Sequence, residues 1–125
     1  MDLIGFDHIV LCVRDVPTSM AFYERVLGMR RHEERPGKWS LHFGANKISL
    51  QDSASVPEIA RNTTPGSGNF CILTRTPIAE AVEHLEMNGI ELVDGPGKRI
   101  GATGAILSIY FHDPDGNLVE VSNAL

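Results

Sequence analysis

The 125-residue chain lacks most of the features that mark specialised protein classes. Its two cysteines, Cys12 and Cys71, lie in apolar strand-like runs, and we expect buried, reduced thiols rather than a disulfide or a catalytic thiol. No apolar run approaches the length of a membrane span, and no signal-peptide pattern stands at the N-terminus. The net charge of −5 comes from interspersed acids and bases, without a basic stripe for nucleic acid. These absences predict a cytoplasmic protein with neither nucleic-acid nor membrane partners.

The sequence does contain an internal repeat. His8 and Asn69 stand 61 residues apart, and the same spacing separates Gly28 from Gly89. Each copy has an apolar strand, a turn with a proline, an amphipathic helix and a terminating glycine, which indicates two similar half-domains sharing a cleft. We therefore expect a single domain over 1–125, with module one at 1–54, a linker at 55–67 and module two at 68–125.

The pattern within each copy predicts one strand, one helix and three further strands. Expected strands are 4–13, 29–34, 39–43 and 47–51 in the first module, and the run from Gly68, 90–93, 105–111 and 117–122 in the second. Asp15 and Thr76 are the expected helix caps, and 95–104 reads as a glycine-rich loop. One helix covers one face of a four-stranded sheet. This favours an α+β fold of two paired βαβββ modules, forming an open barrel-like sheet around a central cleft with the helices outside.

Alternation along the strands assigns polar residues to the cleft. The more uniformly apolar face of each sheet should pack on its helix, so the alternate residues face the other way. Four of these, on the first and last strands of the two modules, are His8, Gln51, Asn69 and Glu120. An imidazole, a carboxylate and two amide oxygens can hold a divalent cation. The alternative is a polar cluster in which Glu120 bonds to protonated His8.

Three segments carry a family resemblance. They are Asp7-His8-Ile9-Val10, the run from Ala21 to Met29, and the run from Tyr110 to Glu120, which contains Asp113-Pro114-Asp115-Gly116. The chain resembles the vicinal oxygen chelate superfamily, which contains glyoxalases, bleomycin-resistance proteins and extradiol dioxygenases. Gly95-Pro96 followed by Arg99 to Ala102 and Ser108 to Phe111 is similar to the small glyoxalase-domain-containing-5-like proteins.

The resemblance implies paired βαβββ modules and one divalent metal ion (Ni, Zn, Co, Mn or Fe). By this likeness His8 and Glu120 are metal ligands, and Gln51 falls where the family has His, Glu or Gln. Asn69 falls where the family commonly has His, which is a departure that leaves it a possible ligand. Members of the superfamily often form homodimers, some with the cleft built across the interface, and we expect a homodimer here.

The leading functional hypothesis is a glyoxalase-like, metal-dependent lyase or isomerase acting on a small substrate with adjacent oxygens. A cation would stabilise an enediolate, and Glu120 would be the catalytic residue that moves the proton. The alternative is a metal-free small-molecule binding protein of the bleomycin-resistance type, which the Asn69 departure favours. A thiol transferase is a weaker reading, and a dioxygenase is weaker still because its iron needs two His and one carboxylate.

Further residues are candidates for substrate binding. The segment 98–104 is interpreted as a lid in which Arg99 holds a carboxylate or phosphate, or alternatively as a solvated turn. Ser108 and Tyr110 alternate toward the cleft, where their hydroxyls can bond substrate, and Asn69 is a further substrate-binding candidate.

Overall fold

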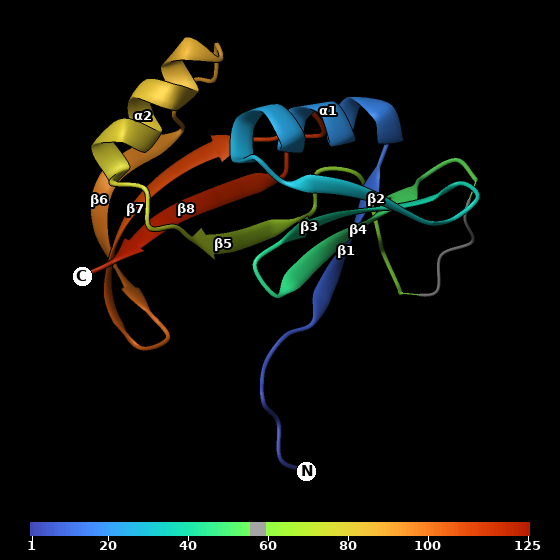
Figure 1. The fold of residues 1–125 in the computed structure, drawn as a ribbon, viewed down its shortest axis with the longest axis horizontal. Coiled ribbons are helices and arrows are strands. Elements are labelled where there is room, and N and C mark those ends of the chain that lie inside the picture. Colours follow the sequence, from blue (N-terminus) through green and yellow to red (C-terminus); the bar gives the residue numbers. More distant parts are fainter. Residues whose placement is uncertain (56–59) are drawn as a thin grey trace. The chain divides into compact units, whose positions relative to one another are not determined.

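The computed structural model describes residues 1–55 and 60–125, and each half of the chain forms the predicted βαβββ module (Figure 1). The first module consists of β1 (His8–Val13), α1 (Val16–Leu27), β2 (Arg30–Arg35), β3 (Lys38–Phe43) and β4 (Asn46–Asp52). The second consists of β5 (Asn69–Leu73), α2 (Ile78–Met87), β6 (Asp94–Gly101), β7 (Gly104–His112) and β8 (Leu118–Ala124). The α+β architecture and the internal repeat are therefore confirmed.

The two modules have the same sheet topology. The strand orders are β1-β4-β3-β2 and β5-β8-β7-β6. In each sheet the first strand pairs in parallel with the last, and the other neighbours are antiparallel. The compact units are Met1–Gly66 and Ser67–Leu125. The single-domain organisation over 1–125 stays a prediction, and residues 56–59 of the predicted linker lie outside the described residues.

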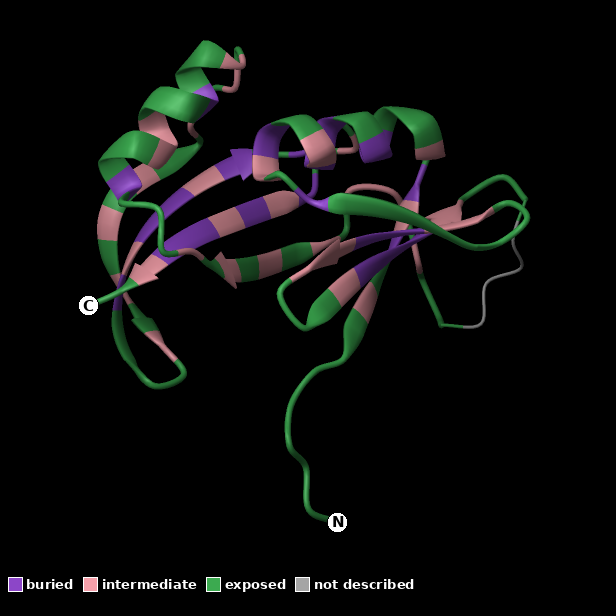
Figure 2. Ribbon diagram, viewed as in Figure 1, coloured by how far each residue is buried: buried purple, intermediate pink, exposed green. Residues whose placement is uncertain are grey.

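Each helix covers the apolar face of its own sheet, as the alternation predicted. Helix α1 contacts β2, β3 and β4, and α2 contacts β7. Buried and less buried residues alternate along β8, where Val119 and Val121 are buried and Glu120 is half-buried (Figure 2). The opposite sheet faces therefore carry the polar side chains.

Helix α1 has the sequence-encoded ends that were expected. The backbone amide of Thr18 donates to Asp15 Oδ2 at 2.9 Å, and Gly28 ends the helix with φ of 66°. Hydrogen bonding to the Thr18 side chain and backbone lowers the pKa of Asp15. No helix among residues 1–55 and 60–125 is both long and apolar enough to cross a membrane.

The N-terminus of α2 differs from the prediction, because Thr76 is not its cap. The amide of Ile78 donates to Asn123 Oδ1 at 3.0 Å, so a side chain from β8 replaces a local cap. The Nδ2 group of Asn123 also donates to the carbonyls of Thr74 and Thr76, at 2.8 and 2.9 Å. A cap supplied from 45 residues away leaves no local signal in the sequence.

Four other expectations were wrong. Strand β1 begins at His8 rather than at residue 4, and residues 1–7 are exposed. Residues 90–93 form no strand, whereas the supposed loop at 95–104 is largely strand β6. Strand β6 pairs with β7. At Gly101 the two strands approach so closely that a Cβ would lie 2.9 Å from Ile106 Cγ2. Cys71 is exposed and Cys12 half-buried, although they form no disulfide.

Candidate functional site

One face of the second sheet carries Glu120 together with its polar neighbours. Glu120 lies directly opposite Cys71 on β5 and opposite Tyr110 on β7, and Ser122 lies opposite Ser108. Partners in register point to the same side of a sheet, so all five side chains share one face. The other face has Val119, Val121, Ile109 and Phe111, which are buried. We call this polar surface the Glu120 face.

The turn between β7 and β8 fixes the start of β8 and hence the position of Glu120. Asp113 Oδ1 accepts the amides of Asp115 and Asn117, both at 2.9 Å, and Asp113 Oδ2 accepts from Asn117 Nδ2 at 2.7 Å. Asn117 Oδ1 in turn accepts the amide of Gly68 at 2.7 Å. The Asp-Pro-Asp-Gly-Asn motif therefore joins the β7–β8 turn to the residue that precedes β5.

A chain of hydroxyl groups supports the Glu120 carboxylate. Ser122 Oγ donates to Glu120 Oε1 at 3.2 Å and lies 2.8 Å from Ser108 Oγ. A hydroxyl has one hydrogen to donate, so Ser122 must accept its other bond from Ser108. Cys71 Sγ lies 3.4 Å from Ser122 Oγ and occupies the second lone-pair position of that oxygen. Because Ser108 and Ser122 are fully buried, this chain of hydroxyl groups holds Oε1 of the carboxylate in place.

The neighbours of Glu120 keep their protons. Burial raises the pKa of the Tyr110 phenol, and the Glu120 carboxylate raises it further. Burial of its sulfur likewise raises the pKa of the Cys71 thiol, against a lowering by the Ser122 hydrogen bond. Both groups are neutral hydrogen-bond donors at neutral pH. In the described part of the chain no Lys, Arg or His forms an ion pair with Glu120.

Arg99 lies on the same face, within a strand rather than in a lid. Its Cζ is 5.5 Å from the centroid of the Tyr110 ring, and its Nη2 donates to Asp94 Oδ2 at 2.7 Å. The strand position follows from register, because Arg99 pairs with Ile106 and Gly97 with Ser108. The lid interpretation of 98–104 is wrong for Lys98 to Gly101, which are paired in β6.

The corresponding face of the first sheet carries His8 and Gln51. His8 Nδ1 lies 2.6 Å from Asp7 Oδ1, and Nε2 makes no hydrogen bond within residues 1–55 and 60–125. A carboxylate beside Nδ1 favours the neutral tautomer that carries its proton on Nδ1, which is the tautomer that binds a metal through Nε2.

Register separates Gln51 from His8 along the strands. His8 pairs with Lys47, whereas Gln51 pairs with Cys12, so the two are offset by four residues, roughly 13 Å at 3.3 Å per residue. In the second sheet Asn69 pairs with Leu118, and Glu120 is offset from Asn69 by two. The repeat therefore makes Ser49 the counterpart of Glu120, and Gln51 the counterpart of Ser122. Ser49 is buried on the same face as Gln51.

The donor chemistry at two of the predicted ligands fits a divalent cation. A neighbouring side chain orients each of them: Asp7 contacts His8 Nδ1, and Ser122 donates to Glu120 Oε1. Among the residues that the structure describes, however, no group of three or more His, Cys, Asp or Glu side chains gathers in one place.

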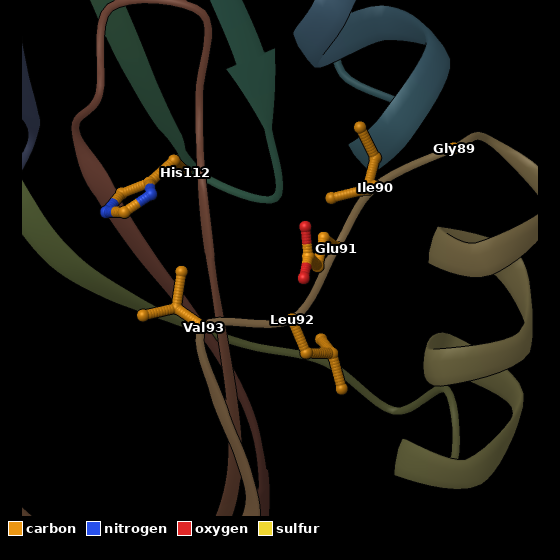
Figure 3. A pocket seen from close by; sticks show the side chains of 6 residues that line it. All are labelled: Gly89, Ile90, Glu91, Leu92, Val93 and His112. Carbon is orange, nitrogen blue, oxygen red and sulfur yellow. The ribbon is translucent and has the colours of Figure 1, made fainter.

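Sequence reasoning missed Ser122, whose hydroxyl contacts Glu120 directly. The available signal was its position two residues after Glu120, which places both on one face. It also missed a hollow of about 410 Å³ beside the connection from α2 to β6, lined by Gly89 to Val93 and His112 (Figure 3). None of the predicted site residues lines this hollow.

Comparison with known proteins identifies the family. The model of the Glyoxalase/Bleomycin resistance protein/Dioxygenase superfamily matches residues 5–121. The chain belongs to this superfamily. Virulence protein STM3117 of Salmonella typhimurium is 47% identical over 118 residues, which cover 93% of this chain and 81% of that protein. The crystal structure of STM3117 aligns with a TM-score of 0.96 at 43% identity, covering all of both chains.

The chain is also similar to an enzyme of named activity. Lactoylglutathione lyase of Salmonella typhimurium is 32% identical over 126 residues, covering 94% of this chain and 90% of that enzyme. The resemblance stated from the motifs is therefore confirmed at the level of the superfamily, whose members include both a lyase and proteins of bleomycin resistance.

Proposed function

We propose that the protein is a glyoxalase-like, metal-dependent lyase or isomerase that acts on a small substrate with adjacent oxygens. The observation that carries this proposal is the environment of the Glu120 carboxylate. Its carboxylate is half-buried, held at one oxygen by Ser122, and without a basic partner among the described residues. A partly buried carboxylate that a hydroxyl orients, and that lacks a basic partner, suits a metal ligand or a proton acceptor.

The proposed metal ligands are His8, Gln51 and Glu120, with Asn69 as a further possible ligand. They would hold one divalent ion (Ni, Zn, Co, Mn or Fe). When bound, such an ion supplies a Lewis acid that polarises a carbonyl and stabilises an enediolate. The contact between His8 Nδ1 and Asp7 supports the assignment of His8, whereas the four-residue offset of Gln51 makes it the weaker ligand.

Glu120 is the proposed catalytic base. Its carboxylate takes a proton from the carbon next to the substrate carbonyl, and the same carboxyl returns that proton to the adjacent carbon. Tyr110 keeps its proton because its pKa is raised, so its hydroxyl, which contacts Glu120 in the free protein, can donate to a substrate oxygen instead. Ser108, fully buried and bonded to Ser122, acts on substrate through Ser122 and Glu120, while Asn69 and Arg99 contact the substrate.

The second candidate is a metal-free protein that sequesters a small molecule. The observation that favours it is that equivalent positions in the two modules do not both carry a metal-binding side chain. Ser49 stands where the second module has Glu120, and Asn69 stands where the first has His8, so each module supplies one strong metal donor. A face with few metal donors suits binding through hydrogen bonds and stacking.

Two substitutions test the enzyme proposal. Glu120→Gln preserves the size of the side chain and its hydrogen bonding but removes the proposed base and an anionic metal ligand. The matched control is Glu86→Gln, at an exposed position of α2. The assays are formation or breakdown of lactoylglutathione, and calorimetric titration of chelator-treated protein with Ni²⁺ and Co²⁺. We expect Glu120→Gln alone to lose turnover and to bind metal at least tenfold more weakly. Full activity in Glu120→Gln would exclude its role, and no metal binding by the wild type would favour the binder.

Assembly and location are also proposals. We expect a homodimer, which light scattering on the purified protein measures directly. We expect a cytoplasmic protein, since Cys12 and Cys71 are not joined in a disulfide.

A further inference from the structure

Arg99 has an unusual setting for a side chain on an edge strand. Its guanidinium lies against the face of the Tyr110 ring, with Cζ 5.5 Å from the ring centroid. Nη1 donates to the carbonyl of Lys98 at 2.9 Å, and Nη2 donates to Asp94 Oδ2 at 2.7 Å. The side chain is 39% exposed. An aromatic ring and two hydrogen bonds thus hold the guanidinium on the Glu120 face in one orientation.

A glycine creates the space for this orientation. A Cβ at Gly97 would lie 2.6 Å from Arg99 Nη1 and 3.4 Å from Cζ, so any side chain there would displace the guanidinium. Gly97 has no positive φ that would by itself require glycine. The absence of a side chain at this position therefore serves the placement of Arg99.

The guanidinium retains donors for a second anion. It carries five N–H groups, of which Asp94 and the Lys98 carbonyl take two. Asp94 is an incomplete partner, because its other oxygen, Oδ1, accepts the amide of Gly95 at 2.8 Å. Asp94 is also 63% exposed and can move away. A free carboxylate could instead form the paired, two-oxygen contact for which guanidinium is shaped.

We propose that Arg99 binds the carboxylate of a small ligand, and that Asp94 occupies this position in the free protein. The ligand class is a small monocarboxylate with an oxygen on the carbon next to the carboxylate, such as a 2-oxo acid. Tyr110 lies beside Arg99 and directly opposite Glu120, so a ligand held at Arg99 extends its remaining oxygens along the ring toward Glu120. This inference rests on the proposed function only for the role of Glu120.

The test is titration of the full-length, chelator-treated protein with pyruvate, followed by amide NMR. Arg99→Gln removes the cation, and Arg31→Gln is its matched control, since Arg31 pairs with Glu24 in the first module. Asp94→Asn removes the competing anion but can still accept the Gly95 amide, with Glu24→Gln as its control. Pyruvamide, which keeps both adjacent oxygens and lacks the charge, is the ligand control.

We expect Arg99→Gln to weaken pyruvate binding by roughly tenfold to a hundredfold, the range for hydrogen bonds to charged groups. Asp94→Asn should strengthen it by about two- to fivefold, the range for a surface ion pair. The two control variants should bind pyruvate as tightly as the wild type does. The wild type should bind pyruvamide as weakly as Arg99→Gln binds pyruvate. Shifts should centre on the amides of Gly95 and Gly97.

Two results would overturn the inference. One is pyruvate binding to Arg99→Gln with wild-type affinity, and the other is no binding to either the wild type or Asp94→Asn. Neither depends on metal or turnover, so failure here is separate from failure of the lyase proposal. Conversely, loss of lactoylglutathione turnover in Glu120→Gln leaves the carboxylate titration unaffected.

Discussion

Two glycines in β6 should respond very differently to substitution by alanine. At Gly95 a Cβ would lie 2.4 Å from the carbonyl oxygen of Ser108 and 3.0 Å from Ile109 Cα, both backbone atoms of β7. Gly95 also has φ of +92°, where alanine is strained. The strained conformation alone costs about 1–2 kcal/mol, and separating two paired strands adds to it. We expect Gly95→Ala to lower the free energy of unfolding by about 2–4 kcal/mol.

At Gly97 the same change meets a movable group. The nearest atoms belong to the Arg99 guanidinium, which can swing into solvent, and φ lies outside the positive region. Replacing glycine by alanine at a compatible position stabilises proteins by about 0.4–1 kcal/mol through the unfolded state. We therefore expect the free energy of unfolding of Gly97→Ala to stay within about 1 kcal/mol of the wild type, while Arg99 leaves Tyr110 and pyruvate affinity falls.

Urea unfolding followed by far-ultraviolet circular dichroism measures both free energies. Equal stability of Gly95→Ala and the wild type would refute the backbone contact with Ser108. A Gly97→Ala protein as unstable as Gly95→Ala would refute the view that Gly97 serves Arg99 rather than the strand. Wild-type pyruvate affinity in a stable Gly97→Ala would refute the proposed dependence of the Arg99 position on this glycine.

Three further predictions concern the second module. In a Tyr23→Phe background, absorbance titration should give Tyr110 a pKa above the usual tyrosine value of about 10. Glu120→Gln should lower the pKa of Tyr110, and an unchanged midpoint would contradict the contact between Tyr110 and Glu120. Because that pKa is raised on folding, the stabilising contribution is complete below about pH 10 and is lost as pH rises through the folded value. Phe111→Ala, at a fully buried position, should cost about 3–5 kcal/mol in urea unfolding. Asn123→Ala should cost about 1–3 kcal/mol and increase amide exchange at Ile78, whereas Thr76→Ala should do neither.

Much of the fold could be predicted because its signals are local and repeated. Alternation placed Glu120, Ser108 and Tyr110 on one sheet face and Val119 and Val121 on the other, as the register shows. The cap at Asp15 and the left-handed Gly28 follow from the chemistry of single residues. Family membership followed from the Tyr110 to Glu120 motif, whose Asp113 and Asn117 make the turn.

The remaining features depend on partners distant in the sequence. Strand β6 was mistaken for a loop because glycine has low strand propensity, whereas here β7 supplies the pairing and Arg99 fills the space above Gly97. The cap of α2 comes from Asn123. The offset of Gln51 from His8 depends on the register of a parallel pair, which alternation alone does not define. The metal ligand set stays a prediction for the same reason.

The most direct test of the central proposal is anomalous diffraction from crystals soaked with Co²⁺. The account predicts a peak within bonding distance of a Glu120 carboxylate oxygen and of His8 Nε2, and its loss in Glu120→Gln crystals. A peak that contacts neither residue, or one that persists unchanged in Glu120→Gln, would contradict the proposal that Glu120 is part of a metal-assisted active site.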